Sequence, residues 1–175
     1  MSFKKTFLPA IILMAICLVC ATALAFTNDV TKDRIAEVDR EKYFAAAAAV
    51  LPQGAVLTEL DLDGVEGFVA KDAEENLIGY AIKGVAKGYG GNVSCVVGFS
   101  VNGDIIGLSV TAPDETPGLG SNVQKPAFTD RFLGISSPEA VDGVAGVTSA
   151  TYSSRAVKKA VNEAIAVFNE ITKGA

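Results

Sequence analysis

The feature that most restricts how this chain can fold is an uninterrupted apolar run at residues 7–26. About twenty residues in an α-helix, at ~1.5 Å each, span ~30 Å, the thickness of the hydrocarbon core of a bilayer. Lys4 and Lys5 precede the run and polar residues follow it, so the positive-inside rule places the N-terminus in the cytoplasm. The sequence therefore predicts a single-pass anchor at residues 1–26 in the cell (inner) membrane, with the remainder of the chain extracytoplasmic.

A cleaved signal peptide is the alternative interpretation of this run, because residues 21–23 and 23–25 have the A-x-A form of a cleavage site. The apolar core of a signal peptide usually has ~7–15 residues. The run in this chain is longer, which favours an anchor that stays attached to the domain.

The composition of the chain excludes several kinds of chemistry. There is no histidine, which rules out Ser-His-Asp catalysis and most zinc sites. A net charge of −5 argues against nucleic-acid binding, because such binding needs a basic patch to neutralise phosphates. Cys17 and Cys20 lie within the apolar run, where we interpret them as small packing residues and not as a redox pair. Cys95 has no partner outside the run, so we expect no disulfide in the exported part.

A helical stalk and several strands are predicted after the anchor. We expect residues 27–54 to form the stalk, with its helix at residues 27–50, because an alanine run favours helix and Pro52 ends it. This stalk can continue from the membrane helix without a break. Strands are expected at residues 67–70 and 77–85, and residues 61–64 are expected to form a turn.

A β-hairpin is the clearest element of the predicted sheet. Asn102-Gly103 predicts its tight primed turn. Ile106, Leu108 and Val110 lie on the returning strand. Along the first strand, apolar residues alternate strictly and mark one buried face: Val93, Cys95, Val97, Phe99 and Val101.

The last predicted helix covers residues 155–171. With strands set between helices, residues 55–175 predict one α+β domain in which an antiparallel sheet is flanked by helices. The apolar residues of the last helix recur at helical spacing, so one face packs on a core: Val157, Val161, Ala164, Ile165, Phe168 and Ile171.

Five hydroxyl residues precede or begin this helix, more than the single cap that a helix start needs. A capped helix start is the simplest interpretation of the cluster. A phosphate site is the alternative, because a helix N-terminus presents unpaired N–H groups and the positive end of the helix dipole. The five residues are Thr148, Ser149, Thr151, Ser153 and Ser154.

The sequence Thr-Ser-Ala-Thr-Tyr-Ser-Ser-Arg-Ala-Val at residues 148–157 resembles the flavinylation motif of the Rnf G-subunit and Nqr C-subunit family. In that family a Ser/Thr-Gly-Ala-Thr core carries FMN through a phosphoester to its last threonine, which corresponds to Thr151. Glu-Thr-Pro-Gly-Leu-Gly at residues 115–120 is similar to a loop of the same family at every position. Gly-Tyr-Gly-Gly at residues 88–91 resembles its glycine turn. Residues 31–52 and 127–132 also resemble segments of the family.

The motif departs from the family pattern at two positions. Ser149 stands where the family has glycine, and Ala145 stands where it has an upstream aspartate. A rival register that runs from Asp142 to Thr148 restores the aspartate and the glycine, but it displaces the downstream Ser-Ser-x-Ala-Val. We therefore expect attachment at Thr151, with Thr148 as the alternative.

The resemblance implies that residues 55–175 bind a covalent FMN that relays electrons. Its implied partners are the other membrane subunits of an Rnf complex, which moves electrons between ferredoxin and NAD and pumps Na⁺ or H⁺, and an exported flavin transferase. The short length of the chain favours the Rnf G-subunit over the Nqr C-subunit. No catalytic residue, metal site or turnover of the isolated subunit is implied. The implied cofactor-binding residues are Thr151, Thr148, Ser149, Ala150, Ser153, Ser154, Glu115, Thr116, Pro117, Gly118, Leu119, Gly120, Tyr89 and Gly90.

Two other functions remain open at this point. The chain could be a stand-alone, membrane-anchored flavinylated carrier for another extracytoplasmic reductase. It could also be a flavin-free interaction subunit in which Thr-Ser-Ala-Thr no longer accepts FMN.

Overall fold

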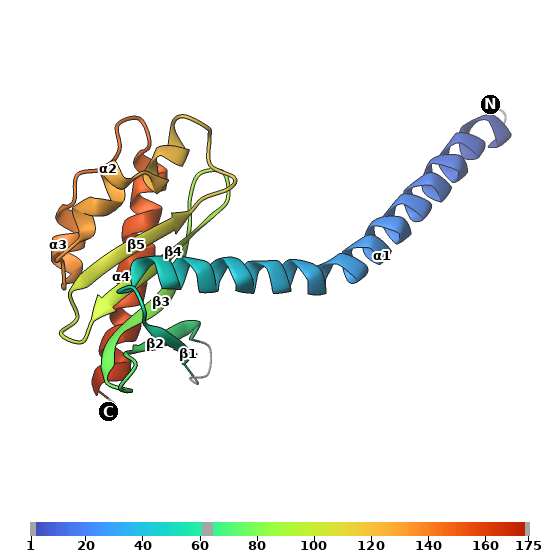
Figure 1. The fold of residues 1–175 in the computed structure, drawn as a ribbon. Coiled ribbons are helices and arrows are strands. Elements are labelled where there is room, and N and C mark those ends of the chain that lie inside the picture. Colours follow the sequence, from blue (N-terminus) through green and yellow to red (C-terminus); the bar gives the residue numbers. More distant parts are fainter. Residues whose placement is uncertain (1–2, 61–64, 174–175) are drawn as a thin grey trace. The chain divides into compact units, whose positions relative to one another are not determined.

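The computed structural model describes residues 3–60 and 65–173, and the predicted turn at residues 61–64 lies outside them. The chain divides into two compact units, Met1–Lys42 and Tyr43–Ala175. Figure 1 shows the elements in chain order. The predicted divisions after residues 26 and 54 stay predictions.

The helix α1 (Phe3–Val50) begins in the first unit and ends in the second without a break. The helix predicted to follow the apolar run, and its continuity with that run, are therefore confirmed as far as Val50. Every side chain from residue 7 to residue 42 is exposed. Between Phe7 and Val50, α1 contains a window with a mean hydropathy of 2.6, which is long and apolar enough to cross a membrane. Cys17 and Cys20 are exposed on this helix.

Five strands form one antiparallel sheet in which each strand pairs with its neighbours in sequence. Both predicted strands before the hairpin are confirmed, whereas β1 was not predicted because it is a short and mostly exposed edge strand. The strands are β1 (Val56–Glu59), β2 (Gly67–Lys71), β3 (Leu77–Lys87), β4 (Asn92–Ser100) and β5 (Ile105–Thr111).

The turn between β4 and β5 is not the tight primed turn that Asn102-Gly103 predicts. Of these two residues only Gly103 has a positive φ, of 91°, whereas a type I′ turn needs positive φ at both. The Gly103 N–H donates to the Ser100 carbonyl (3.0 Å) and the Ser100 N–H donates to the Asp104 carbonyl (2.9 Å). The hairpin therefore closes through a longer loop.

The predicted buried face of the hairpin is confirmed for most of its length. Val101 is an exception because it lies in the turn and is exposed. A register shift after Gly98 places Phe99 opposite Ile105, so Ile105 is buried and the predicted Ile106 is exposed. The fully buried positions of β4 are Val93, Cys95, Val97 and Phe99.

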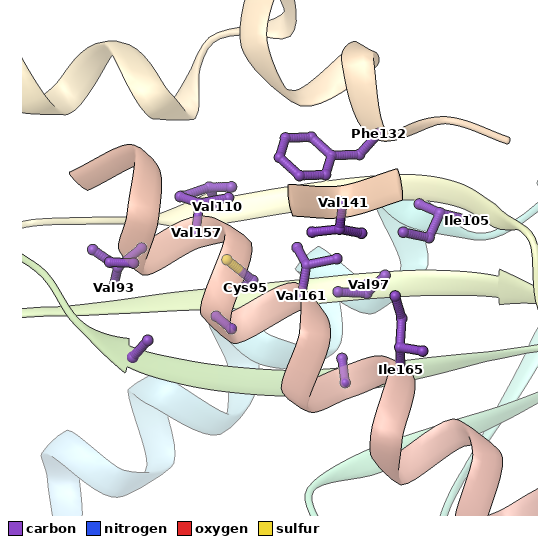
Figure 2. Packing of buried hydrophobic residues seen from close by; sticks show 14 of the residues in the cluster. Val93, Cys95, Val97, Ile105, Val110, Phe132, Val141, Val157, Val161 and Ile165 are labelled. Carbon is purple, nitrogen blue, oxygen red and sulfur yellow. The ribbon is translucent and has the colours of Figure 1, made fainter. Parts of the chain in front are cut away.

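The helix α4 (Thr151–Lys173) packs on β3 and β4 and covers one face of the sheet. It starts four residues before the predicted helix, and its predicted apolar face is confirmed. Figure 2 shows how side chains of α4 meet those of β4 and β5 in the main core. The labelled residues are Val93, Cys95, Val97, Ile105, Val110, Phe132, Val141, Val157, Val161 and Ile165.

The last turns of α1, within the second unit, pack on the opposite face of the sheet. Ala47, Val50 and Leu51 form a smaller buried cluster there with residues of β2, β3 and β4. Glycines allow both helices to approach the strands. A Cβ added to Gly84 would lie 2.0 Å from the Ala160 carbonyl oxygen of α4, and a Cβ on Gly98 would lie 2.4 Å from the Val50 carbonyl oxygen.

Short helices connect β5 to α4 and complete the main core. The predicted helix at residues 127–132 is present as α2 (Pro126–Thr129) followed by the 3₁₀-helix η2 (Asp130–Phe132). The 3₁₀-helix η1 (Gly120–Gln124) precedes them and α3 (Pro138–Gly143) follows. Phe128, Phe132 and Val141 from this connection are buried in the main core.

Candidate functional site

Three segments that the sequence singled out meet at one end of the sheet: the β3–β4 loop at residues 88–91, the loop at 115–120 and the start of α4 (Figure 1). Glu115 joins them. Its Oε1 accepts hydrogen bonds from the N–H groups of Tyr89 (2.7 Å) and Gly90 (3.3 Å), and its Oε2 accepts one from the Ser153 hydroxyl (2.6 Å). Glu115 is 4% exposed. A buried junction therefore holds the three segments together.

The glycines around this junction are required by the close approach of backbone and side chain. A Cβ on Gly90 would lie 1.9 Å from the Asp114 carbonyl oxygen. A Cβ on Gly88 would lie 2.2 Å from Glu115 Oε1, and one on Gly120 would lie 2.3 Å from Glu115 Oε2. Carbon contacts are normally ~3.5 Å or more, so these glycines serve the packing of the loops.

The first turn of α4 offers free hydrogen-bond donors. The Ala150 carbonyl accepts the Ser154 N–H (2.9 Å), so Ala150 occupies the N-cap position and Thr151 is the first helical residue. An alanine side chain cannot cap. Within the described residues, the N–H groups of Thr151, Tyr152 and Ser153 meet no hydrogen-bond acceptor. These donors and the helix dipole favour an anion beside the exposed Thr151 hydroxyl.

Ser149 adopts a left-handed backbone conformation, with a φ of 63°. This region costs an ordinary L-residue ~1–2 kcal/mol and costs glycine almost nothing. The motif that the sequence resembles has glycine at this position. The conformation explains why glycine suits the motif, and it shows that serine can hold the same turn.

The hydroxyls of Ser153 and Ser154 are buried and have partners inside the protein. The Ser153 hydroxyl donates a hydrogen bond to Glu115, as described above, so its hydrogen is not available to a ligand. Ser154 Oγ accepts the N–H of Val147 (2.9 Å), which fastens the preceding loop to α4. The Ser154 hydroxyl donates to no acceptor among the described residues, and Ser154 lines a pocket described below.

Two pockets lie on either side of Ser149 and Thr151, which line both of them. The first, called here the aromatic pocket, has a volume of about 320 Å³. The rings of Tyr89 and Tyr152 stand 6.0 Å apart at its rim and are 73% and 66% exposed. The aromatic pocket is lined by Tyr89, Glu115, Thr116, Leu119, Gly120, Ser149, Ala150, Thr151, Tyr152 and Ser153.

The second pocket, called here the cationic pocket, has a volume of about 340 Å³ and contains the charges of Arg155 and Lys158. Lys158 Nζ donates to the Asp142 carbonyl (2.8 Å), whereas the Arg155 guanidinium meets no acceptor among the described residues. A third pocket beside it is lined in part by Lys125, Arg131 and Thr148. The cationic pocket is lined by Gly146, Val147, Thr148, Ser149, Thr151, Ser154, Arg155 and Lys158.

Most of the residues that the sequence analysis put forward meet around these two pockets. Gly90, Pro117 and Gly118 line neither of them, although the Gly90 N–H reaches Glu115. Tyr152 and Lys158 were missed. Tyr152 could have been found, because it follows Thr151 directly and is an exposed aromatic residue at a helix start.

The donors and pockets fit a phosphorylated, planar aromatic ligand. An anion at the start of α4 would meet free N–H groups and the Arg155 charge. A flat ring would find aromatic side chains and glycine backbone in the aromatic pocket. The two volumes lie near the lower end of the ~300–1,000 Å³ range of small-molecule sites, and Ser149 and Thr151 line both pockets.

Comparisons with known families match most of the chain. Residues 88–166 match the FMN-binding domain family, and residues 1–50 match the RnfG N-terminal region. The chain is 30% identical to the G subunit of the Na(+)-translocating ferredoxin:NAD(+) oxidoreductase complex of Acetobacterium woodii, over 98% of this chain and 95% of that protein. It is also 30% identical to the G subunit of the ion-translocating oxidoreductase complex of Methanosarcina acetivorans, over 94% and 96%.

Two solved structures share the fold over most of the chain. NqrC of Shewanella oneidensis matches with a TM-score of 0.53 at 20% identity, over 75% of this chain and 73% of that chain. The C subunit of the Na(+)-translocating NADH-quinone reductase of Parabacteroides distasonis matches with a TM-score of 0.51 at 21% identity, over 67% and 76%. The predicted α+β class, with its antiparallel sheet flanked by helices, is confirmed.

Proposed function

The chain belongs to the family of G subunits of ion-translocating ferredoxin:NAD(+) oxidoreductase complexes, and we propose that it carries electrons in such a complex through a covalently bound FMN. The family resemblance expected from the motifs is confirmed by these relatives and by the two matched family regions. As a subunit of an oxidoreductase, the chain acts as an electron carrier and has no turnover by itself.

Thr151 is the proposed attachment residue, and one observation carries the proposal: its exposed hydroxyl stands at the start of α4, between the aromatic and the cationic pocket. A phosphate on Thr151 would meet the N–H groups of Tyr152 and Ser153 and the charge of Arg155. The ring would lie in the aromatic pocket. FMN, when bound, supplies redox chemistry that no side chain of the chain provides.

Thr148 is the less favoured attachment residue. It lines the cationic pocket but not the aromatic pocket. The rival register also depends on Asp142, whose carboxylate accepts a hydrogen bond from Asn162 of α4 (3.1 Å) and is therefore engaged within the fold. Both observations support Thr151.

The experiment is the intact mass of the full chain, produced together with a flavin transferase and purified in detergent. The wild type should carry the mass of FMN less one water. Thr151→Ala should lose this mass, Thr151→Ser should keep part of it because the hydroxyl remains, and the matched control Thr148→Ala should keep most of it. Covalent flavin on Thr151→Ala together with its loss from Thr148→Ala would refute the chosen register.

We further propose that α1 anchors the chain, with the second unit outside the cytoplasm beside the other membrane subunits. A covalent bond would retain the cofactor in a compartment where free FMN is scarce, and an exported flavin transferase would make it. Two alternatives have distinct outcomes. A stand-alone carrier would purify with flavin but without Rnf subunits. A flavin-free interaction subunit would purify with those subunits but show no in-gel flavin fluorescence after denaturation.

A further inference from the structure

Glu115 is unusual among the acidic side chains of this protein. Among the described residues it is the only charged side chain that is buried, at 4% exposed. None of the ion pairs in the described part of the chain involves it. Burial of a carboxylate without a cation is costly unless hydrogen bonds compensate for the lost water. The three hydrogen bonds that Glu115 accepts must therefore offset the cost of its burial.

All the hydrogen-bond partners of the Glu115 side chain among the described residues donate to its oxygens. Two backbone N–H groups reach Oε1 and the Ser153 hydroxyl reaches Oε2, so every contact delivers a hydrogen. Hydrogen bonds of this kind are roughly twice as strong as neutral ones. Gly120 packs against Oε2, where even a Cβ would come within 2.3 Å. Little of the carboxylate is left to contact a ligand.

We infer that Glu115 is not a flavin ligand but a positioning residue that locks the loop at 88–91 to α4, and that its negative charge, which forms no ion pair among the described residues, lowers the reduction potential of a flavin held in the aromatic pocket. The lock acts through Tyr89, whose ring stands at the rim of that pocket, and through Ser153 in the first turn of α4. The effect on the potential rests on the proposed function, whereas the lock does not.

The direction of the electrostatic effect follows from charge alone. Adding electrons to a flavin makes it more negative, and a fixed negative charge in the pocket wall opposes this. A buried charge is screened by salt much less than a surface charge. Asp114 provides a matched comparison, because it is the preceding residue, carries the same charge and is exposed.

The first experiment measures the flavin reduction potential of the detergent-purified, flavinylated full chain by spectroelectrochemical titration. Glu115→Gln keeps the size and the oxygen that accepts from Tyr89, and the Ser153 hydroxyl can rotate to accept from the new amide. At a fixed potential, the ratio of reduced to oxidised flavin should rise at least about tenfold, which is a positive shift of ~30 mV for a two-electron couple. Asp114→Asn should change the ratio less than about threefold, because solvent and salt screen its charge.

The second experiment measures the lock without flavin, by hydrogen exchange in the full chain produced without a transferase. Glu115→Ala should speed exchange at the Tyr89 and Gly90 amides at least about tenfold, because their acceptor is lost. Glu115→Gln and the control Asp114→Ala should leave both amides nearly unchanged. The Leu60 amide donates to the Gly67 carbonyl at the far edge of the sheet (2.9 Å). Its exchange rate should be the same in every variant.

The two experiments test the electrostatic effect and the lock separately from the proposed function. An unchanged potential in Glu115→Gln, or an equal shift in Asp114→Asn, would overturn the electrostatic part. Unchanged exchange in Glu115→Ala would overturn the lock. A wild-type chain that gains no FMN mass would overturn the proposed function and the electrostatic part with it, while the exchange result would still decide the lock.

Discussion

Replacing Gly84 with alanine should strongly destabilise the second unit. Gly84 lies on β3, where α4 crosses the sheet, and an added Cβ would lie 2.0 Å from the Ala160 carbonyl oxygen and 2.8 Å from its carbon. Both are backbone atoms, so no side-chain rotation can relieve the overlap. The helix must therefore move away from the strand by more than ~1 Å before carbon contacts reach their normal ~3.5 Å.

The expected loss of stability follows from that displacement. Overpacking a core costs ~1–3 kcal/mol, and we take the upper end because a gap of about 1 Å forfeits a quarter to a half of each dispersion contact along α4. Alanine restricts the unfolded chain more than glycine, which offsets ~0.5–1 kcal/mol. The free energy of unfolding should thus fall by ~2 kcal/mol, or about 7 °C in Tm for a unit of roughly 130 residues.

Cys95 provides the assay, because it pairs with Gly84 across β3 and β4 and is fully buried. Burial raises the pKa of the Cys95 thiol, so it should react with an alkylating reagent only when the unit opens. In a Cys17→Ala, Cys20→Ala background, alkylation of Cys95 across a urea series and thermal circular dichroism both report unfolding. The control is Gly143→Ala, where nothing lies within 4 Å of the new Cβ. A Gly84→Ala variant as stable as that control would refute the reasoning.

Four further predictions test other parts of the structure. Ser149→Gly should raise the free energy of unfolding by ~0.5 kcal/mol, because relief of the left-handed strain outweighs the added chain entropy; a lower urea midpoint would contradict this. Gly107→Ala should lower Tm by several degrees, since its Cβ would lie 2.5 Å from the Val50 carbonyl oxygen; an unchanged Tm would show that the end of α1 does not pack there. Tyr152→Ala should retain covalent flavin but alter its absorbance, and an identical spectrum would place the ring elsewhere. In intact cells, a membrane-impermeant thiol reagent should label Asn28→Cys and spare Ser2→Cys, and the reverse pattern would invert the proposed topology.

Sequence periodicity predicted the elements that bury one face and expose the other. The alternation along β4 and the helical spacing along α4 marked the main core, because each of these elements has one side against it. β1 is mostly exposed, so its side chains show little alternation between buried and exposed positions. α3 has only six residues, too few to show helical periodicity. Its sequence signal is the N-cap residue Ser137, whose hydroxyl accepts the Ala140 N–H (3.3 Å).

The turn and the site show where such patterns stop being informative. Asn102-Gly103 is a good primed-turn pair, but the register shift after Gly98 changes the loop that the hairpin needs. The family motifs pointed to three segments that the fold brings together. Their connection through Glu115 depends on contacts over 25 and 38 residues of sequence, which no local pattern encodes. The role of Gly84 depends in the same way on Ala160.

The position of α4 in the chain has a consequence for the timing of maturation. The strands of the sheet follow one another as a meander, so each can pair with its predecessor as the chain emerges. α4 comes last, and it both covers the sheet and begins with Thr151. The proposed acceptor hydroxyl therefore reaches its final setting only after the strands that α4 covers have been synthesised. On this proposal, FMN is attached only to chains in which α4 has formed. Truncated or misfolded chains would carry no flavin and would transfer no electrons.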